Sequence, residues 1–185
     1  MPAETDERRV VLYELLSLDG VAEEPGDWSS ISPELIANLG RIIATQDDVI
    51  LGHATYDYWS DYWPSATIEP FAAFINGVRK HVVARESIAL DWANSTRATG
   101  PLGDYVAALK RQTGRDIGIH GSIAVAQALL RAGLVDELRL VVAPALAGTG
   151  RRLFPDDGTL NRLALTSVDR CPDGTVLLAY GAERP

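Results

Sequence analysis

Apolar residues come in short unbroken runs along most of this chain. Residues 10–18 are almost entirely apolar, with a single charge at Glu14, and residues 135–144 form a second long stretch that includes Leu138, Leu140, Val141 and Val142. Runs of this kind, bounded by turn residues, are typical of strands that are buried on both faces of a sheet. We therefore predict strands at five places, residues 10–18, 48–52, 80–84, 116–120 and 135–144.

Helical patterns fill the stretches between these strands. Ser32, Pro33 and Glu34 supply a hydroxyl cap, a proline at the first helical position and an acid in the first turn, which together indicate a helix start. The apolar residues that follow share one helical face: Leu35, Ile36, Leu39, Ile42 and Ile43. Further helices are predicted at residues 53–59, 103–113 and 122–132, and Gly133 closes the last of them.

The pattern changes near the end of the chain. Residues 163–169 and 175–180 flank the turn Pro172-Asp173-Gly174, which predicts an antiparallel hairpin. Strands that alternate with helices predict an α/β fold, here a mostly parallel sheet covered by helices, with antiparallel strands at one edge. We expect one domain over residues 8–182, a disordered acidic leader at residues 1–7 and a short tail at 183–185.

Composition and charge exclude several classes of protein. The chain has 17 Lys and Arg against 25 Asp and Glu, a net charge of −8, which argues against nucleic acid or a membrane surface as the main partner. Its one cysteine, Cys171, excludes an intrachain disulfide and a cysteine-based zinc site, and it favours the reducing cytoplasm. The acidic start does not resemble a signal peptide, and the histidines lack metal-ligand spacing, so we expect no membrane segment and no metal.

Glycines follow two of the predicted strands at the point where a helix begins. Gly52 precedes the helix at residues 53–59, and Gly121-Ser122 precedes the helix that continues through Ile123. In open α/β sheets ligands bind beyond the carboxyl ends of the strands, and the free amides of a helix N-terminus attract phosphate. Each glycine could equally serve only to make the turn. His53 and His120 lie at the same two junctions, where an imidazole could donate to a phosphate.

Two further groups of cations follow strand ends. Arg85 comes after the strand at residues 80–84, and its alternative is a solvated surface arginine. The segment Gly148-Thr149-Gly150-Arg151-Arg152 follows the last long strand, and it suits an anion-binding loop and a mobile connection equally well.

Acidic and aromatic residues give less specific signals. Glu14 interrupts the most apolar strand, so its carboxyl group must be paired, must face a cleft or must have a raised pKa. Asp19 closes the same strand, where it could simply shape the turn. The aromatic cluster that includes Tyr56 could line a pocket for a flat ring or pack in the core, and His81 fits packing within its strand.

These motifs together resemble the dihydrofolate-reductase-like superfamily, and most closely the reductase domain of bifunctional riboflavin-biosynthesis deaminase-reductases. The resemblance rests on six segments and covers roughly residues 8–182: Ser17-Leu18-Asp19-Gly20-Val21, Leu51-Gly52-His53-Ala54-Thr55-Tyr56, Tyr62-Trp63-Pro64, His120-Gly121-Ser122, residues 132–138 and residues 148–154. It implies a three-layer α/β/α fold and a homodimer. It also implies an enzyme that passes a hydride from NADPH to a heteroaromatic or ribosylaminopyrimidine-like substrate.

The resemblance also implies roles for individual residues. The cofactor would be held by Gly52, His53, Thr55, Arg85, His120, Gly121, Ser122 and Ile123, with Arg85 at the adenosine 2′-phosphate. Asp19 and Glu14 are the catalytic candidates. The substrate would lie near Tyr13, Leu15, Trp28, Tyr56 and Arg151.

This chain departs from the family pattern at several points. His53 stands where arginine is frequent, and His120 stands where glycine is frequent. The chain also lacks the H-x-E and P-C-x-x-C motifs of the zinc deaminase half of the bifunctional enzymes. These departures leave a second hypothesis open, a non-catalytic protein that binds a nucleotide or small metabolite on the same scaffold.

Overall fold

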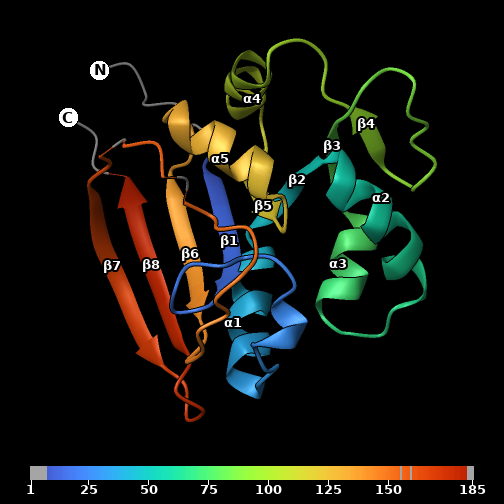
Figure 1. Cartoon of the computed structure of the whole chain (residues 1–185). Helices are drawn as coiled ribbons and strands as arrows, with labels where there is room; N and C mark the ends of the chain where they lie inside the picture. Colours follow the sequence, from blue (N-terminus) through green and yellow to red (C-terminus); the bar gives the residue numbers. More distant parts are fainter. Residues whose placement is uncertain (1–7, 155, 159, 183–185) are drawn as a thin grey trace.

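One sheet of eight strands forms the centre of the molecule (Figure 1). The computed structural model describes residues 8–154, 156–158 and 160–182. The strands are β1 (Val10–Leu16), β2 (Gln46–Gly52), β3 (Arg79–Val83), β4 (Ser95–Arg97), β5 (Asp116–His120), β6 (Glu137–Val142), β7 (Leu163–Arg170) and β8 (Val176–Ala182). The helices are α1 (Pro33–Ile43), α2 (His53–Tyr62), α3 (Phe71–Gly77), α4 (Leu102–Lys110) and α5 (Ile123–Arg131), with short 3₁₀ turns at Pro25–Asp27 and Trp63–Ser65.

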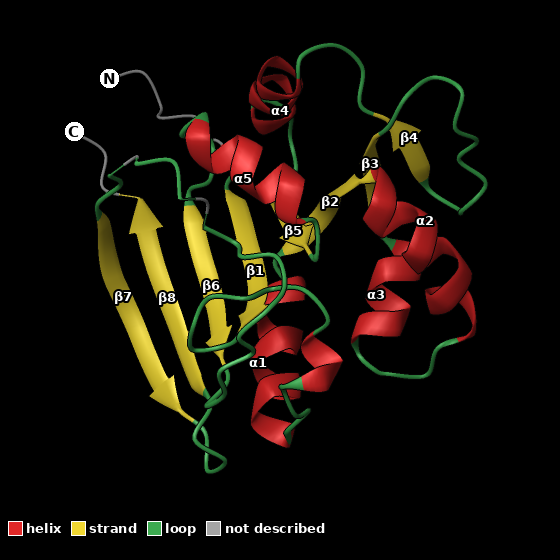
Figure 2. Ribbon diagram, in the orientation of Figure 1, coloured by secondary structure: helices red, strands yellow, loops and turns green. Residues whose placement is uncertain are grey.

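The strand order is β4-β3-β2-β5-β1-β6-β8-β7. Neighbouring strands are parallel from β4 to β6, whereas β8 is antiparallel to both β6 and β7. The expected α/β fold with a mixed, mostly parallel sheet and a C-terminal antiparallel hairpin is therefore confirmed. In Figure 2 strands β7 and β8 extend beyond the helices at one edge of the sheet.

Two apolar layers cover the two faces of this sheet. On one face the inward residues of β1, Val10 and Leu12, pack with α4 and α5. On the other face Val11 and Tyr13 pack with α1, α2 and α3. Because successive side chains of a strand point to opposite faces, Glu14 lies on the α5 side and Tyr13 on the α1 side.

Local signals explain the elements that the sequence predicted well. The Ser32 hydroxyl accepts a hydrogen bond from the amide of Leu35 at 3.2 Å, and Pro33 opens α1 as expected. The strand predicted at residues 135–144 is shorter, because Val135 and Pro144 lie outside β6. The helix predicted at 103–113 ends at Lys110.

Two elements were not predicted, α3 and β4. Helix α3 has seven residues and no side-chain cap, and β4 has three residues with no apolar alternation. Both depend on neighbours rather than on local pattern: α3 packs through Phe71 and Ile75 against the α1 side of the sheet, and β4 pairs with β3.

The amino edge of the sheet is held by buried charges. Asp48 is fully buried and pairs with Arg8 and Arg79, and its other oxygen lies 2.8 Å from Nε2 of His81. The Tyr105 hydroxyl lies 2.7 Å from Nδ1 of the same ring, so His81 packs within the sheet as expected. The predicted leader and tail lie outside the described residues. Within the described ranges, no helix has the length and apolar character needed to cross a membrane.

Candidate cofactor and active site

The two glycine junctions meet at the carboxyl edge of β2 and β5. The amide of Gly52 donates to the Ser122 hydroxyl at 3.0 Å, and the Thr55 hydroxyl donates to the carbonyl oxygen of Gly121 at 3.0 Å. These two bonds bring the N-terminal ends of α2 and α5 side by side. The sequence motifs therefore form one site rather than two.

The backbone angle and the space at this corner both require glycine at position 121. Its φ angle is +62°, a region that L residues with a side chain rarely adopt. A Cβ atom placed there would lie 2.8 Å from the Trp59 ring. The bare backbone of Gly121 is also exposed, so a ligand can approach it closely.

Ser122 and Ile123 stabilise the junction from within. Ser122 is 3% exposed and its hydroxyl accepts the Gly52 amide, while Ile123 packs in the core under α5. A phosphate at this corner would therefore meet main-chain amides rather than these side chains.

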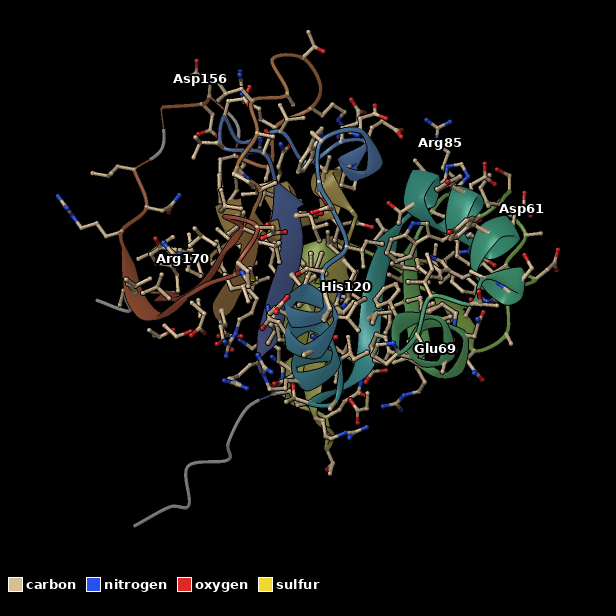
Figure 3. All side chains as sticks on the ribbon, turned by 90° about the horizontal axis from the view of Figure 1, so that it is seen from below. Asp61, Glu69, Arg85, His120, Asp156 and Arg170 are labelled. Carbon is tan, nitrogen blue, oxygen red and sulfur yellow. The ribbon has the colours of Figure 1, made fainter. Side chains whose placement is uncertain are left out.

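A cavity of about 730 Å³ opens next to this corner, between the start of α2 and the loop that joins β3 to β4. We call it the basic pocket, because His53, Arg85 and Arg97 line it with Glu86 as the one carboxylate in its lining. Arg85 is exposed, and Figure 3 places it at the outer rim beside α2. The structure thus brings together two residues that the sequence placed at the cofactor, His53 and Arg85.

Glu14 lies at the centre of the sheet with an unusual protonation state. It is 4% exposed, and burial raises the pKa of its carboxyl group to about 8, although the amides of Leu15 and Gly121 partly oppose this shift. Its Oε2 atom has no hydrogen-bond partner among the described residues. At neutral pH the group is therefore mostly protonated, as a proton donor requires.

Asp19 does not share this property, and its catalytic role stays a prediction. Its carboxylate accepts the amides of Ala147 and Gly148 at 3.0 and 2.9 Å and the hydroxyl of Ser17 at 2.6 Å. These hydrogen bonds, with that of Ser17 the strongest, lower its pKa to about 2. Asp19 is thus a charged clamp between the loop after β1 and the loop after β6, with no proton to donate at neutral pH.

The role expected of His120 is corrected, because its ring points into the core. It is 3% exposed, and its Nε2 atom lies 2.8 Å from Oε1 of Gln46. The rings of Tyr13, Phe71 and Phe74 surround it, and burial lowers its pKa to about 3, so the imidazole is neutral. Figure 3 shows it near the middle of the molecule, so the phosphate contact expected for this side chain is not available.

The loop at residues 148–152 is bonded to the segment that follows β1. Val21 forms a bridge with Arg152, the Ala22 amide donates to the carbonyl of Arg151, and the Arg151 amide donates to Glu23 at 3.1 Å. The Arg151 side chain is exposed, so its predicted contact with substrate stays a prediction.

The remaining substrate candidates do not converge on one place. Tyr13 and Leu15 pack on the α1 side of the sheet, opposite to Glu14. Trp28 donates its ring N–H to the carbonyl of Glu23 at 3.1 Å. Tyr56 is buried, and its hydroxyl accepts a hydrogen bond from the amide of Trp92. It therefore packs in the core, which was the second of the two roles predicted for the aromatic cluster.

Tyr56 also borders a second cavity of about 380 Å³, and this cavity carries the opposite charge. Asp57, Asp61 and Asp91 line it, and no Lys or Arg does. A phosphate would be repelled there, so the basic pocket is the better place for an anionic cofactor.

Sequence reasoning placed only His53 and Arg85 in the basic pocket and missed its second arginine, Arg97. It lies in the three-residue strand β4, which carries no recognisable pattern, so no sequence signal could have placed it at the pocket.

Comparisons with known proteins agree with this architecture. The family described as "RibD C-terminal domain" matches residues 8–177. The "Uncharacterized protein YyaP" of Bacillus subtilis is 25% identical over 181 residues, which cover 94% of this chain and 95% of the relative. A "putative riboflavin biosynthesis protein" from Shewanella superposes with a TM-score of 0.78 at 18% identity, over 95% of this chain and 99% of that chain.

A bifunctional enzyme also shares the fold. The deaminase/5-amino-6-(5-phosphoribosylamino)uracil reductase of Thermotoga maritima has a TM-score of 0.69 at 16% identity, over 96% of this chain and 57% of that chain. The chain thus shares the α/β fold of these two proteins. The chain belongs to the RibD C-terminal domain family, which confirms the resemblance seen in the sequence.

Proposed function

We propose that this protein is an NADPH-dependent reductase that transfers a hydride to a heteroaromatic or ribosylaminopyrimidine-like substrate. The observation that carries the proposal is the basic pocket, which adjoins the corner formed by Gly52 and Gly121. NADPH has phosphates at its centre and a further phosphate on its adenosine ribose. Amides at the corner and Arg85 in the pocket match these two positions.

The residues present fit the cofactor in shape as well as in charge. The exposed backbone of Gly121 allows close approach to the corner, and the pocket volume of about 730 Å³ is large enough for a nucleotide portion. The lining of the pocket contains two arginines and His53 but only one glutamate, although the net charge of the whole chain is −8. The local charge therefore favours an anion where the net charge does not.

The chemistry divides between the cofactor and the chain. When bound, NADPH supplies the hydride. Reduction of a C=N or C=O bond also needs a proton, and Glu14 is the buried acid that holds one at neutral pH. We assign to Glu14 the donation of this proton to the substrate.

The direct test follows NADPH oxidation by absorbance with purified protein and a panel of pyrimidines, pterins and flavin precursors. We expect turnover with at least one member of the panel. Binding of NADPH without turnover of any member would contradict the reductase and favour the non-catalytic binding protein. If the protein did not bind NADPH at all, both the reductase and the non-catalytic binding protein would be contradicted.

We also propose that the protein is a homodimer that pairs through the β7–β8 hairpin. All eight residues of β7 are exposed, and Leu165 and Val168 are 54% and 57% exposed. Leu165 is aligned with Tyr180 and Val168 with Leu178, across a bulge that shifts the register by one residue. The bulge keeps both side chains on one face, since a regular strand would turn residues three apart to opposite faces.

We call Leu163, Leu165 and Val168, with Leu178 and Tyr180 beside them, the apolar strip. Figure 2 shows the hairpin at the free edge of the sheet, past α5. An exposed apolar edge strand of this kind is a surface for pairing with another chain, and a second copy would cover it.

A further inference from the structure

Arg97 makes a set of contacts that the reaction itself does not require. Its guanidinium donates to the carbonyl oxygens of Ala84 at 3.1 Å and Glu86 at 3.4 Å, and also to those of Arg85 and Ile88. Within the described part of the chain, every hydrogen bond of this side chain goes to the main chain of one loop. Arg97 therefore holds the β3–β4 loop from β4, a strand that adjoins it in the sheet.

This loop is one wall of the basic pocket and carries Arg85. Its second half is anchored by Trp92, which is buried and bonded to Tyr56 and Asn76. Its first half is less supported, because Arg85, Glu86 and Ser87 are exposed and the main-chain bond across this turn runs from the Ile88 amide to the Arg85 carbonyl at 3.1 Å. Without Arg97 the carbonyls of Ala84 and Glu86 would be free to rotate toward water or toward the pocket, and that of Arg85 would keep only its bond from the Ile88 amide. The shape of this part of the wall thus depends mainly on Arg97.

The direction of the carbonyls also fixes the direction of the amides. In a trans peptide the C=O of one residue and the N–H of the next point to opposite sides. With the carbonyls of Ala84, Arg85 and Glu86 turned to Arg97, the amides of Arg85, Glu86 and Ser87 face away from it. None of these three amides has a hydrogen-bond acceptor among the residues described. Consecutive free amides of this kind can bind an anion.

We propose that Arg97 is a positioning residue that sets the preference of the basic pocket for a nucleotide with a 2′-phosphate. It acts by holding the loop so that Arg85 and the neighbouring amides are presented together. The inference rests on the proposed function, because it assigns Arg97 to the cofactor site of that reductase. Arg97 also lines the pocket, but its hydrogen bonds go to main-chain carbonyls of the loop, and we assign its effect on the preference for a 2′-phosphate to the position of that loop.

The experiment measures binding of two fragments, 2′,5′-ADP and 5′-ADP, by calorimetry to the whole chain. Neither fragment contains nicotinamide, and only 2′,5′-ADP carries the 2′-phosphate. The variants are Arg97→Lys, which keeps the charge but loses the planar fork, Arg97→Gln, which loses both, and Arg85→Gln. Arg111→Gln is the matched control, because Arg111 is an exposed arginine at the end of α4.

We expect wild type and Arg111→Gln to prefer 2′,5′-ADP. Arg97→Lys and Arg97→Gln should each weaken binding of 2′,5′-ADP about tenfold and change binding of 5′-ADP little. The expected loss between the displaced loop and the 2′-phosphate is that of about one charge-assisted hydrogen bond. The double variant Arg85→Gln/Arg97→Lys should lose less binding free energy for 2′,5′-ADP than the two single variants lose together, because both residues act through one loop.

Two results would overturn the role of Arg97 while leaving the reductase intact. One is a wild-type preference for 2′,5′-ADP in Arg97→Lys, which would make charge alone sufficient. The other is an equal loss for both fragments, the result of a purely structural role. Absence of binding of either fragment to the wild type would instead overturn the proposed function, and the role of Arg97 with it. Melting temperatures of all variants identify any that fail to fold, and Arg97→Lys is the milder change if Arg97→Gln does.

Discussion

Glu14 is the residue on which the proposed proton transfer depends. Its surroundings are apolar on the α5 side of the sheet, so burial rather than a charged neighbour raises the pKa of the carboxyl group to about 8. A carboxylic acid that stays protonated at neutral pH is uncommon, and it is more often found at a functional site than elsewhere.

The rate of turnover should therefore fall as pH rises through about 8, because the donor loses its proton there. Glu14→Gln keeps the shape of the side chain and removes the transferable proton, and we expect kcat to drop by about 10²-fold or more. The measurement is kcat against pH for both proteins with the substrate identified in the panel. A Glu14→Gln enzyme with wild-type kcat and the same pH profile would exclude Glu14 as the donor.

The same pKa has a consequence for stability that needs no substrate. The folded protein favours the protonated form, so stability is greatest below the pKa of the unfolded chain, about 4.3, and declines as pH rises toward 8. Glu14→Gln has no charge to bury. Its free energy of unfolding should exceed that of wild type at pH 8 by about 1–3 kcal/mol, and the two should converge near pH 4. Denaturant titrations at both pH values measure this, and a pH-independent difference would contradict it.

Asp19, the other catalytic candidate, links two loops through its hydrogen bonds. Its carboxylate is ionised at neutral pH and accepts amides from the loop after β6. We expect Asp19→Asn to raise KM with kcat largely kept, because it loosens the loop that carries Arg151 without removing a proton donor. Asp61→Asn, an exposed aspartate on α2, is the control. A loss of kcat with unchanged KM would contradict this expectation and support a catalytic role for Asp19.

At the scale of elements, the corner between α2 and α5 is the feature that local sequence indicated best. Strand, glycine and helix start could be read in order from residues 48–59 and 116–132 because each signal is local. The hydrogen bonds between the two junctions could not be predicted from the sequence, since they depend on β2 and β5 being neighbours in the sheet.

Gly121→Ala tests this corner. The new methyl group would meet the Trp59 ring at 2.8 Å on a backbone with positive φ, so we expect a loss of about 1–3 kcal/mol in the free energy of unfolding and weaker binding of NADPH. Gly26→Ala is the matched control, because a Cβ atom there has no neighbour within 4 Å and Gly26 has no positive φ. Equal stability and equal NADPH affinity for both variants would contradict the role of Gly121.

The β7–β8 hairpin gives a prediction about association. Val168→Lys places a charge within the apolar strip, whereas Ser167→Lys places the same charge on the opposite face of the same strand. We expect wild type and Ser167→Lys to sediment as dimers and Val168→Lys as a monomer. A monomeric wild type, or a dimer in all three, would show that the strip is not the subunit interface.

At the scale of the whole molecule, the order and type of most elements followed from the sequence, because apolar runs and caps act locally. The elements that were missed, α3 and β4, are short and depend on packing partners. The direction of individual side chains was harder to predict. His120 and Tyr13 lie at the expected positions in the chain, yet both point to the α1 side, away from Glu14. The contribution of Arg97 depends entirely on tertiary contacts.

Charge is also distributed unevenly over the molecule. The β3–β4 loop and α2 border two cavities, one with arginines and a histidine and the other with three aspartates. The basic pocket therefore offers an anionic ligand a local binding place in a chain of net charge −8. The central claim is that this place receives NADPH.

The most direct test is a fluorescence titration of NADPH and NADH into wild type and Arg85→Gln. We predict saturable binding of NADPH to the wild type, about tenfold weaker in Arg85→Gln, with NADH affected little because it lacks the 2′-phosphate. No binding of NADPH to the wild type, or the same NADPH affinity in both proteins, would contradict the account.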